Sequence, residues 1–378
     1  MITLMQDKNL FYNFYYEWWK NIDKFIFSLI ILLFITGLFF SLVSTSLIAS
    51  DRLNTNDYLF FFKHLIFVFL GIVIIFFFSS INEKNLFRIS PIIFIISVFF
   101  LILVPFIGIE VKGSKRWIDL FILPRFQPIE IVKPFLIIFI SSILSAQKYS
   151  NIFFKYFLSF LTTLVVAFLL TIQPDIGQTI LIFLSWAILI FTSGISIILL
   201  SILFVSIILI FLYLVFFIQK FEYIKNRLFS FFDTESGAYN FQSDKAIESI
   251  VSGGFFGKGI GEGTLKNRVP EAHTDYIISV ISEEFGVIAI ILILLLFLMF
   301  IYSIFKKVYL ENEEKTKLIL VGCASLILMQ AMIHIGVNIR LFPTTGMTLP
   351  FISYGGSSII SISILSGIIL NLTKRKIY

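Results

Sequence analysis

The segment at residues 270–284, PEAHTDYIISVISEE, places His273, Asp275 and Glu283 around the start of a long apolar run, where charge is costly. Asp275 falls in the first turn of the expected helix. Ser279 projects from the same face at about 100° per residue, so a polar stripe leads inward from the helix start. A carboxylate in the first turn either stabilises the positive end of the helix, by ~0.3–1 kcal/mol, or serves as a general base. The residue types leave both interpretations open.

Glu283 lies deeper in the same helix, about 12 Å beyond Asp275 at a rise of 1.5 Å per residue. A bare ionised carboxylate in lipid costs several kcal/mol, so Glu283 is expected to face protein, water or a cation. The alternative is that the helix start stands above the bilayer.

Acidic residues also stand at two other places where an apolar run begins after a proline. In QPIEIVK, residues 127–133, proline stands near a helix start and places Glu130 and Lys133 three residues apart on one face. Asp175 follows Gln-Pro at another break, in the position of a helix cap. An internal ion pair and a cap are the structural interpretations. The functional interpretation is that Glu130, Asp175 and Asp275 converge on one pocket.

The composition indicates the environment in which these residues lie. Of the 378 residues 58% are hydrophobic and 14% charged, and mean hydropathy is +0.99. A soluble core of this size needs far less apolar surface. Ten runs are long enough to cross ~30 Å of hydrocarbon as helices, at 24–49, 58–80, 89–108, 128–146, 152–172, 176–192, 194–219, 274–305, 318–341 and 349–371. We predict an all-α polytopic membrane protein, with residues 1–378 as a single integral membrane domain and a long extracytoplasmic loop at 220–273, between the seventh and eighth spans.

Lysine and arginine fix the expected orientation, because they resist translocation in short connections. With the N-terminus inside, the inner segments hold fourteen of these residues and the outer short loops about six. The N-terminal tail 1–23 and the C-terminal tail 372–378 are therefore expected in the cytoplasm. The first span is expected to serve as an uncleaved anchor.

Basic residues also mark the outer face, with Arg116 in the loop at 109–127 and Arg227 and Lys258 in the long loop. Basic residues beside acidic helix ends suggest an anionic ligand at the outer surface. Contact with anionic lipid headgroups is the alternative.

Other chemistries find no support. The single Cys323 and three histidines make neither an internal disulfide nor a structural zinc site. The glycine-rich segment SGGFFGKGIGEG, residues 252–263, fails both the phosphate-loop and the dinucleotide spacing. We expect it to be pliable backbone that approaches a membrane or an oligosaccharide closely. Neither a nucleotide cofactor nor a nucleic-acid partner is expected.

The ninth and tenth spans are joined by FPTTGMTLPFISYGGSS, residues 342–358, where prolines and glycines interrupt apolar sequence. Irregular backbone is tolerated at membrane depth only where protein or a water-filled cavity covers it. We expect this connection to form part of a pocket wall. Gly355 and Gly356 have the alternative role of allowing close helix packing.

The motifs SKRWI, FQPIEIVKP, QPDIGQ, AIESIVSGGFFGKGIGEG, RVPEAHTDYIISVISEEFG and GMTLPFISYGGSS follow one another from Lys115 to Ser358. In this order on ten spans, they resemble the bacterial shape, elongation, division and sporulation proteins, the polytopic peptidoglycan polymerases typified by RodA and FtsW. The stretches around 257–275 and 333–358 look more like the division branch than the elongation branch.

The resemblance implies polymerisation of the lipid-linked disaccharide lipid II at the outer face of the bacterial cytoplasmic (inner) membrane, for septal synthesis. The family's essential aspartate matches Asp275, with Tyr276 in place of phenylalanine. Its glutamate and lysine match Glu130 and Lys133, with isoleucine where serine is usual. Asp175 also carries over, with glutamine in place of the family's threonine at position 178.

The chemistry requires a sugar hydroxyl to attack an anomeric carbon that is linked to lipid pyrophosphate, so a general base is needed and Asp275 is the candidate. Cationic groups are wanted for the leaving pyrophosphate, and Mg²⁺ or Mn²⁺ held partly by Glu130 is a candidate cofactor. The candidate substrate-binding residues are Arg116, Glu130, Lys133, Asp175, Arg227, Lys258, His273, Ser279 and Glu283.

Three alternatives stay open: a transporter that flips the same lipid, an elongation-type polymerase, and a scaffold that recruits division proteins. The resemblance implies a class B penicillin-binding protein as partner, together with other division proteins and membrane lipids. The polar groups gather at the outer end, which favours catalysis over transport.

Overall fold

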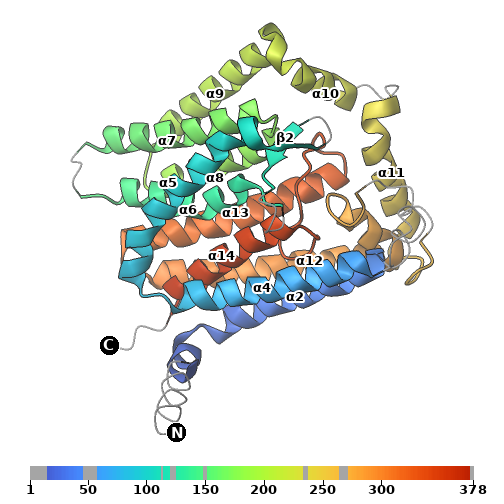
Figure 1. The fold of residues 1–378 in the computed structure, drawn as a ribbon, viewed down its shortest axis with the longest axis horizontal. Helices are drawn as coiled ribbons and strands as arrows, with labels where there is room; N and C mark the ends of the chain where they lie inside the picture. Colours follow the sequence, from blue (N-terminus) through green and yellow to red (C-terminus); the bar gives the residue numbers. More distant parts are fainter. Residues whose placement is uncertain are drawn as a thin grey trace.

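The computed structural model describes residues 15–45, 58–111, 114–119, 125–147, 151–232, 237–263 and 271–374. Within these ranges each of the ten predicted spans contains a helix (Figure 1). The helices are α2 (Lys24–Thr45), α4 (Leu59–Ser80), α5 (Glu83–Ile107), α6 (Pro128–Leu144), α7 (Ile152–Ile172), α8 (Ile176–Thr192), α9 (Ile197–Phe217), α12 (Ile277–Leu310), α13 (Glu314–Asn338) and α14 (Gly356–Leu372).

Seven of these helices are long and apolar enough to cross a bilayer, namely α2, α4, α5, α7, α9, α12 and α13. The other three, α6, α8 and α14, have 17 residues each. The prediction of a polytopic, all-α membrane protein is confirmed.

Three helix boundaries differ from the predicted ones. α5 begins at Glu83, before the predicted residue 89, since the Asn82 side chain accepts a hydrogen bond from the Lys84 N–H at 3.0 Å. α14 begins only at Gly356, although the tenth span was predicted from residue 349. α12 begins at Ile277, so Asp275 precedes the helix instead of standing in its first turn.

The core of the bundle is α14, most of which is buried between α4 and α6 (Figure 1). Small residues permit this proximity: a Cβ on Gly71 of α4 would stand 2.5 Å from the Ser363 hydroxyl, and one on Gly356 would stand 2.5 Å from the Phe67 ring. The predicted packing role of Gly356 is therefore confirmed. At the periphery, α9 buries only Val215.

The predicted outer loops contain regular structure. Strands β1 (Ile109–Val111) and β2 (Ser114–Trp117) pair antiparallel in the first loop. The segment between α9 and α12 holds the short 3₁₀ helix η1 (Gln219–Phe221) and the helices α10 (Glu222–Phe232) and α11 (Gly237–Gly253). We call residues 218–276 the outer segment. Figure 1 shows α10 and α11 bordering the end of the bundle opposite to the two chain termini.

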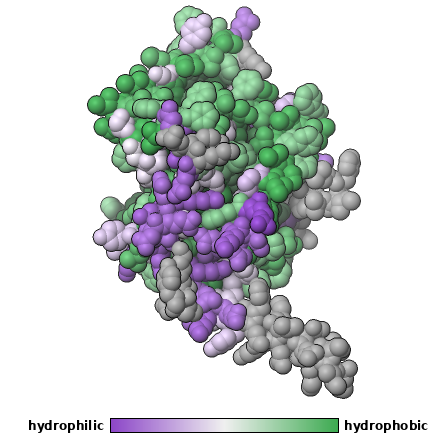
Figure 2. Space-filling model, turned by 90° about the vertical axis from the view of Figure 1, so that its left-hand side faces the viewer, coloured by the Kyte–Doolittle hydropathy of each residue, from purple (hydrophilic) through white to green (hydrophobic). Residues whose placement is uncertain are grey.

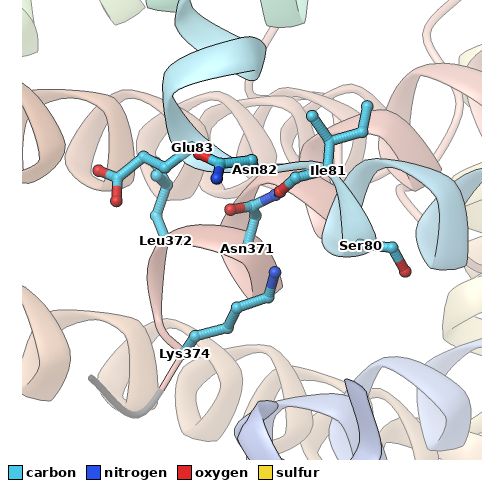
Figure 3. Close-up of a pocket in the computed structure, with 7 residues that line it drawn as sticks. All are labelled: Ser80, Ile81, Asn82, Glu83, Asn371, Leu372 and Lys374. Carbon is cyan, nitrogen blue, oxygen red and sulfur yellow. The ribbon is translucent and has the colours of Figure 1, made fainter. Parts of the chain in front are cut away.

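The predicted cytoplasmic end is joined by polar contacts. Lys307 pairs with Asp23 at 2.6 Å, and the Thr316 hydroxyl donates to Glu83 at 3.2 Å. Figure 2 looks onto this end, where hydrophilic residues gather in one region and hydrophobic residues surround them. A cavity of about 360 Å³ lies here between the α4–α5 turn and the end of α14 (Figure 3). The Asn371 amide donates to the carbonyls of Phe78 and Ile81 at 2.6 and 2.7 Å, which ties the end of α14 to that of α4.

The helix α12 is broken at Gly286, whose φ of 75° and ψ of −177° are not helical. The glycine-rich segment supplies the missing backbone partners. The N–H groups of Lys258 and Gly259 donate to the carbonyls of Glu283 and Glu284 at 2.9 and 3.0 Å. Beyond the break, the Val287 N–H donates to the Gly254 carbonyl at 3.0 Å. Backbone groups on both sides of the break thus gain hydrogen-bond partners, which a low-dielectric setting favours.

These hydrogen bonds show that the glycine-rich segment approaches the backbone of α12. A Cβ on Gly253 would stand 1.9 Å from the Ser282 carbonyl oxygen, and one on Gly257 would stand 2.1 Å from that of Glu284. The pliable backbone predicted to approach a membrane or a sugar lies in the structure against the backbone of α12.

Replacing Gly286 by alanine tests this close approach. The new Cβ would stand 2.2 Å from the Phe255 carbonyl oxygen, in a backbone conformation that alanine disfavours. We expect the free energy of unfolding to fall by more than about 2 kcal/mol, measured by thermal unfolding in detergent. Gly261→Ala is the control, because Gly261 also has a positive φ, of 85°, but has nothing within 4 Å. Equal losses in the two variants would contradict the close approach.

Candidate active site

Asp275 stands in a turn that immediately precedes α12. The N–H groups of Thr274, Asp275 and Tyr276 lie 3.1 to 3.3 Å from the Glu271 carbonyl. The Asn338 amide donates to the Asp275 carbonyl at 3.0 Å. These bonds fix the backbone, while the side chain stays only half-buried. Ser279, the next residue of the predicted polar stripe, is fully buried, and its hydroxyl donates to the Tyr276 carbonyl at 2.7 Å.

The connection between α13 and α14, residues 339–355, lies beside Asp275. It is irregular as predicted, and its residues 349–353 are buried. The Ser353 hydroxyl donates to the Thr274 carbonyl at 2.7 Å, and the Tyr354 N–H donates to the His273 carbonyl at 3.1 Å. A Cβ on Gly346 would stand 3.6 Å from Asp275 Oδ2. The α13–α14 connection therefore forms a wall directly against the Asp275 carboxylate.

Arg227 of α10 reaches this wall from the outer side, where its guanidinium donates to the Thr344 carbonyl at 2.9 Å. The neighbouring Tyr276 hydroxyl feels both charges. Burial, and next the negative charge of Asp275, raise the pKa of Tyr276, while the Arg227 guanidinium opposes that rise. Arg227 therefore contacts the α13–α14 connection two residues from Gly346, which borders the Asp275 carboxylate.

Glu130 and Lys133 form a buried ion pair in α6, with Lys133 Nζ 2.7 Å from Glu130 Oε2. The Gln178 amide donates to Glu130 Oε1 at 2.9 Å, and Lys133 donates to Gln330 Oε1 at 3.3 Å. The predicted internal ion pair is present. Each charge has at least one further polar neighbour, as deep burial demands.

Asp175 caps α8, where its carboxylate accepts from the Gln178 N–H at 3.5 Å. The Gln127 amide donates to it at 2.8 Å, and the Arg116 guanidinium lies 3.8 Å away. Arg116 also donates to the carbonyls of Gln173 and Pro174. Burial raises the pKa of Asp175, and the Arg116 guanidinium opposes that rise. The predicted cap is confirmed.

The Glu130–Lys133 pair and the Asp175–Arg116 pair both lie near the same stretch of the α13–α14 connection. The Gln330 amide, beside Lys133, donates to the Thr348 carbonyl at 3.0 Å. A Cβ on Gly177, beside Asp175, would stand 2.8 Å from Thr345 and 3.0 Å from the Met347 sulfur. Neighbours of Glu130 and Asp175 therefore support the connection at Thr345, Met347 and Thr348, and Asp275 borders it at Gly346.

The surroundings of Glu130 do not fit a divalent cation. Both of its close neighbours, the Lys133 ammonium and the Gln178 amide, present hydrogen-bond donors to the carboxylate. The described part of the chain holds no group of three or more His, Cys, Asp or Glu side chains arranged around a common point. A Mg²⁺ or Mn²⁺ ion at Glu130 stays a prediction, and no chemical step is derived from it.

The remaining predicted residues lie at the edges of this site. Lys258 pairs with the fully buried Glu283 at 3.3 Å, which fastens the glycine-rich segment to α12. The His273 ring packs against Phe60, with ring centroids 4.7 Å apart. His273 lies two residues before Asp275 in the chain.

Sequence reasoning missed three residues of α13 that hydrogen-bond either to the wall or to the Asp275 backbone. Besides Gln330, the His334 ring hydrogen-bonds to the Met347 carbonyl at 2.7 Å, and Asn338 bonds to Asp275. The signal was in the sequence: these polar residues recur every four positions within an apolar span, which places them on one helix face.

A family model described as cell cycle protein, covering FtsW, RodA and SpoVE, matches residues 23–378. The probable peptidoglycan glycosyltransferase FtsW of Caulobacter vibrioides is 32% identical over 360 residues, which cover 95% of this chain and 91% of that protein. The one from Haemophilus influenzae is 32% identical over 373 residues, covering 94% and 93%.

Two solved structures have a similar fold. A chain of a peptidoglycan synthase complex, studied for its coordination of polymerization and crosslinking, superposes with a TM-score of 0.78 at 24% identity, covering 93% of this chain and 97% of that one. The rod shape determining protein RodA of Thermus thermophilus has a TM-score of 0.68 at 24% identity, covering 93% and 96%.

Replacing Lys133 by methionine tests the buried pair. The change leaves the Glu130 carboxylate without its counter-charge, and we expect a loss of ~3–5 kcal/mol in the free energy of unfolding. The double variant Glu130→Gln/Lys133→Met should recover most of that loss, because no bare charge remains. Lys245→Met breaks a partly exposed pair on α11 and should cost ~0–1 kcal/mol. A Lys133→Met variant that unfolded at the wild-type temperature would show that the pair does not stabilise the fold.

Replacing Tyr276 by phenylalanine tests the buried phenol. The Tyr276 side chain is 2% exposed, and its hydroxyl finds no hydrogen-bond partner among the described residues. We expect the variant to be at least as stable as wild type, with a gain of up to ~1 kcal/mol. Ser353→Ala is the contrast, because it deletes a hydroxyl that is bonded to Thr274 and Leu349 and should cost ~1–3 kcal/mol. A clear loss of stability in Tyr276→Phe would reveal a partner for the phenol.

Proposed function

The chain belongs to the FtsW, RodA and SpoVE family of cell cycle proteins, and from this premise we propose that it polymerises lipid II into glycan strands for septal wall synthesis. It is a peptidoglycan glycosyltransferase and a multi-pass membrane protein. The division role is supported by relatives that cover nearly the whole chain and carry the name FtsW.

The observation that carries the proposal is the contrast between Asp275 and the other acidic residues of the site. Glu130, Asp175 and Glu283 are at most 3% exposed. Asp275 is partly exposed, on a backbone fixed from α13. A general base must reach the substrate, and among these four the Asp275 carboxylate is the accessible one.

The proposed reaction begins when Asp275 accepts the proton of a sugar hydroxyl on the acceptor. The hydroxyl oxygen forms a bond to the anomeric carbon of the donor sugar, and the bond from that carbon to the lipid pyrophosphate breaks. The pyrophosphate leaves with the bonding electron pair, and its growing negative charge favours a nearby cation. Arg227 is the candidate for this role, because it donates to the Thr344 carbonyl, two residues from Gly346, which borders Asp275.

The buried residues have a positioning role in this proposal. Arg116, Asp175, Glu130 and Lys133 hold the inner side of the α13–α14 connection, whose outer side borders Asp275. Loss of these residues would displace the wall and disturb the geometry that the reaction requires.

A class B penicillin-binding protein is the proposed partner, which would cross-link the strands. Support comes from the fold, which is similar to that of a chain within a peptidoglycan synthase complex. We also propose the orientation with both termini in the cytoplasm, in which Asp275 faces the outer surface.

A lipid II flippase is the second candidate, because broken helices such as α12 are common in transporters. It would use the same headgroup but form no glycosidic bond, so one experiment separates the two functions.

The experiment supplies lipid II to the purified protein with its cognate transpeptidase and measures glycan chains over time. We expect Asp275→Asn to lower the polymerisation rate by ~10²–10⁴-fold with an unchanged melting temperature. Glu262→Gln, which changes an exposed carboxylate in the glycine-rich segment, should polymerise at the wild-type rate. Normal polymerisation by Asp275→Asn would remove the proposed base. Headgroup translocation in vesicles without any polymer would favour the flippase.

A further inference from the structure

The α13–α14 connection is held from outside by both helices of the outer segment, each through an arginine. Arg227 of α10 donates to the Thr344 carbonyl at 2.9 Å. Arg340, at the start of the connection, pairs with Asp244 of α11 at 2.6 Å. The second contact is the one that the proposed mechanism does not use.

Arg340 is unusual because its backbone adopts the left-handed conformation, with φ of 57°. A side chain is disfavoured there, and glycine would adopt the same conformation without cost. Arginine at this position indicates that its side chain does something that the backbone turn alone does not require. Among the described residues, the Arg340 side chain pairs with Asp244.

The turn at Arg340 sets the path of the chain toward the site. The Leu341 N–H donates to the Gly336 carbonyl at 2.7 Å, and the Phe342 ring packs where a Cβ of Gly336 would stand. A few residues later, Thr345 and Met347 press on Gly177, and Gly346 borders Asp275. A displacement at Arg340 is therefore transmitted to the wall of the site over a short length of chain.

We propose that Arg340 is a positioning residue whose ion pair with Asp244 couples α11 to the α13–α14 connection and thereby sets the wall against Asp275. This inference rests on the proposed polymerase function. It assigns Arg340 no contact with the substrate, so its effect passes through the connection.

The structure offers a matched control on the same helix. Lys245 and Glu248 pair at 2.6 Å within α11, with side chains that are 23% and 48% exposed, against 22% and 39% for Arg340 and Asp244. The two pairs are alike in length and exposure, but the Lys245 pair does not reach the connection. Glu248→Gln should therefore leave polymerisation unchanged.

The test compares Arg340→Gly, Asp244→Asn, the double variant and the charge-swapped Arg340→Asp/Asp244→Arg. Arg340→Gly removes the side chain and relieves the backbone, so its melting temperature should equal or exceed that of wild type. We expect both single variants to lose about three- to fivefold in kcat with little change in KM, and the double variant to lose no more than either single one. The swap should restore kcat to within about twofold, because aspartate tolerates the left-handed conformation.

Salt gives a second readout that a purely structural role would not move. Rising ionic strength should lower the wild-type rate more than that of Arg340→Gly, so that the ratio of the two rates falls, since the pair is partly exposed. Full activity of Arg340→Gly, or failure of the swap to restore kcat, would overturn the inference. Those results leave the proposed function intact as long as Asp275→Asn remains inactive. A polymerising Asp275→Asn variant would overturn the function instead.

Discussion

The free-energy cost of placing a charge in an apolar bundle governs how this protein is built. Lys133 and Glu283 are fully buried, and each is paired with a residue of opposite charge. The same constraint acts on the backbone, because the carbonyls freed where α12 breaks accept hydrogen bonds from the glycine-rich segment. These buried charges therefore enter the bundle together with oppositely charged partners, and such pairs surround the site.

Two kinds of acidic residue result from this constraint. Glu130 and Asp175 are bonded to donors on several helices, so they join α6, α8 and α13 around the α13–α14 connection. Asp275 has its backbone fixed in the same way, but its carboxylate stands at the boundary of the bundle. Rigid support behind an accessible group is the arrangement that catalysis requires.

Sequence patterns predicted the features that depend on residues close together in the chain. The ten spans followed from the length of apolar runs, the Asp175 cap from Gln-Pro-Asp before a run, and the Glu130–Lys133 pair from spacing. The break in α12 could not be predicted, because one glycine within a helical pattern is usually tolerated. It becomes a break only through the segment at 253–259, a contact between distant parts of the chain. The helices α10 and α11 were missed because their moderate polarity resembles that of a loop.

The dependence of α12 on the glycine-rich segment has a consequence for biosynthesis. Residues 253–259 leave the ribosome before α12, so the partner of each half-helix end already exists when that helix emerges. The reverse order would expose unsatisfied carbonyls beside Glu283 to hydrocarbon during insertion. Chain order thus lets the most polar stretch of the bundle assemble against a template that was made some seconds earlier.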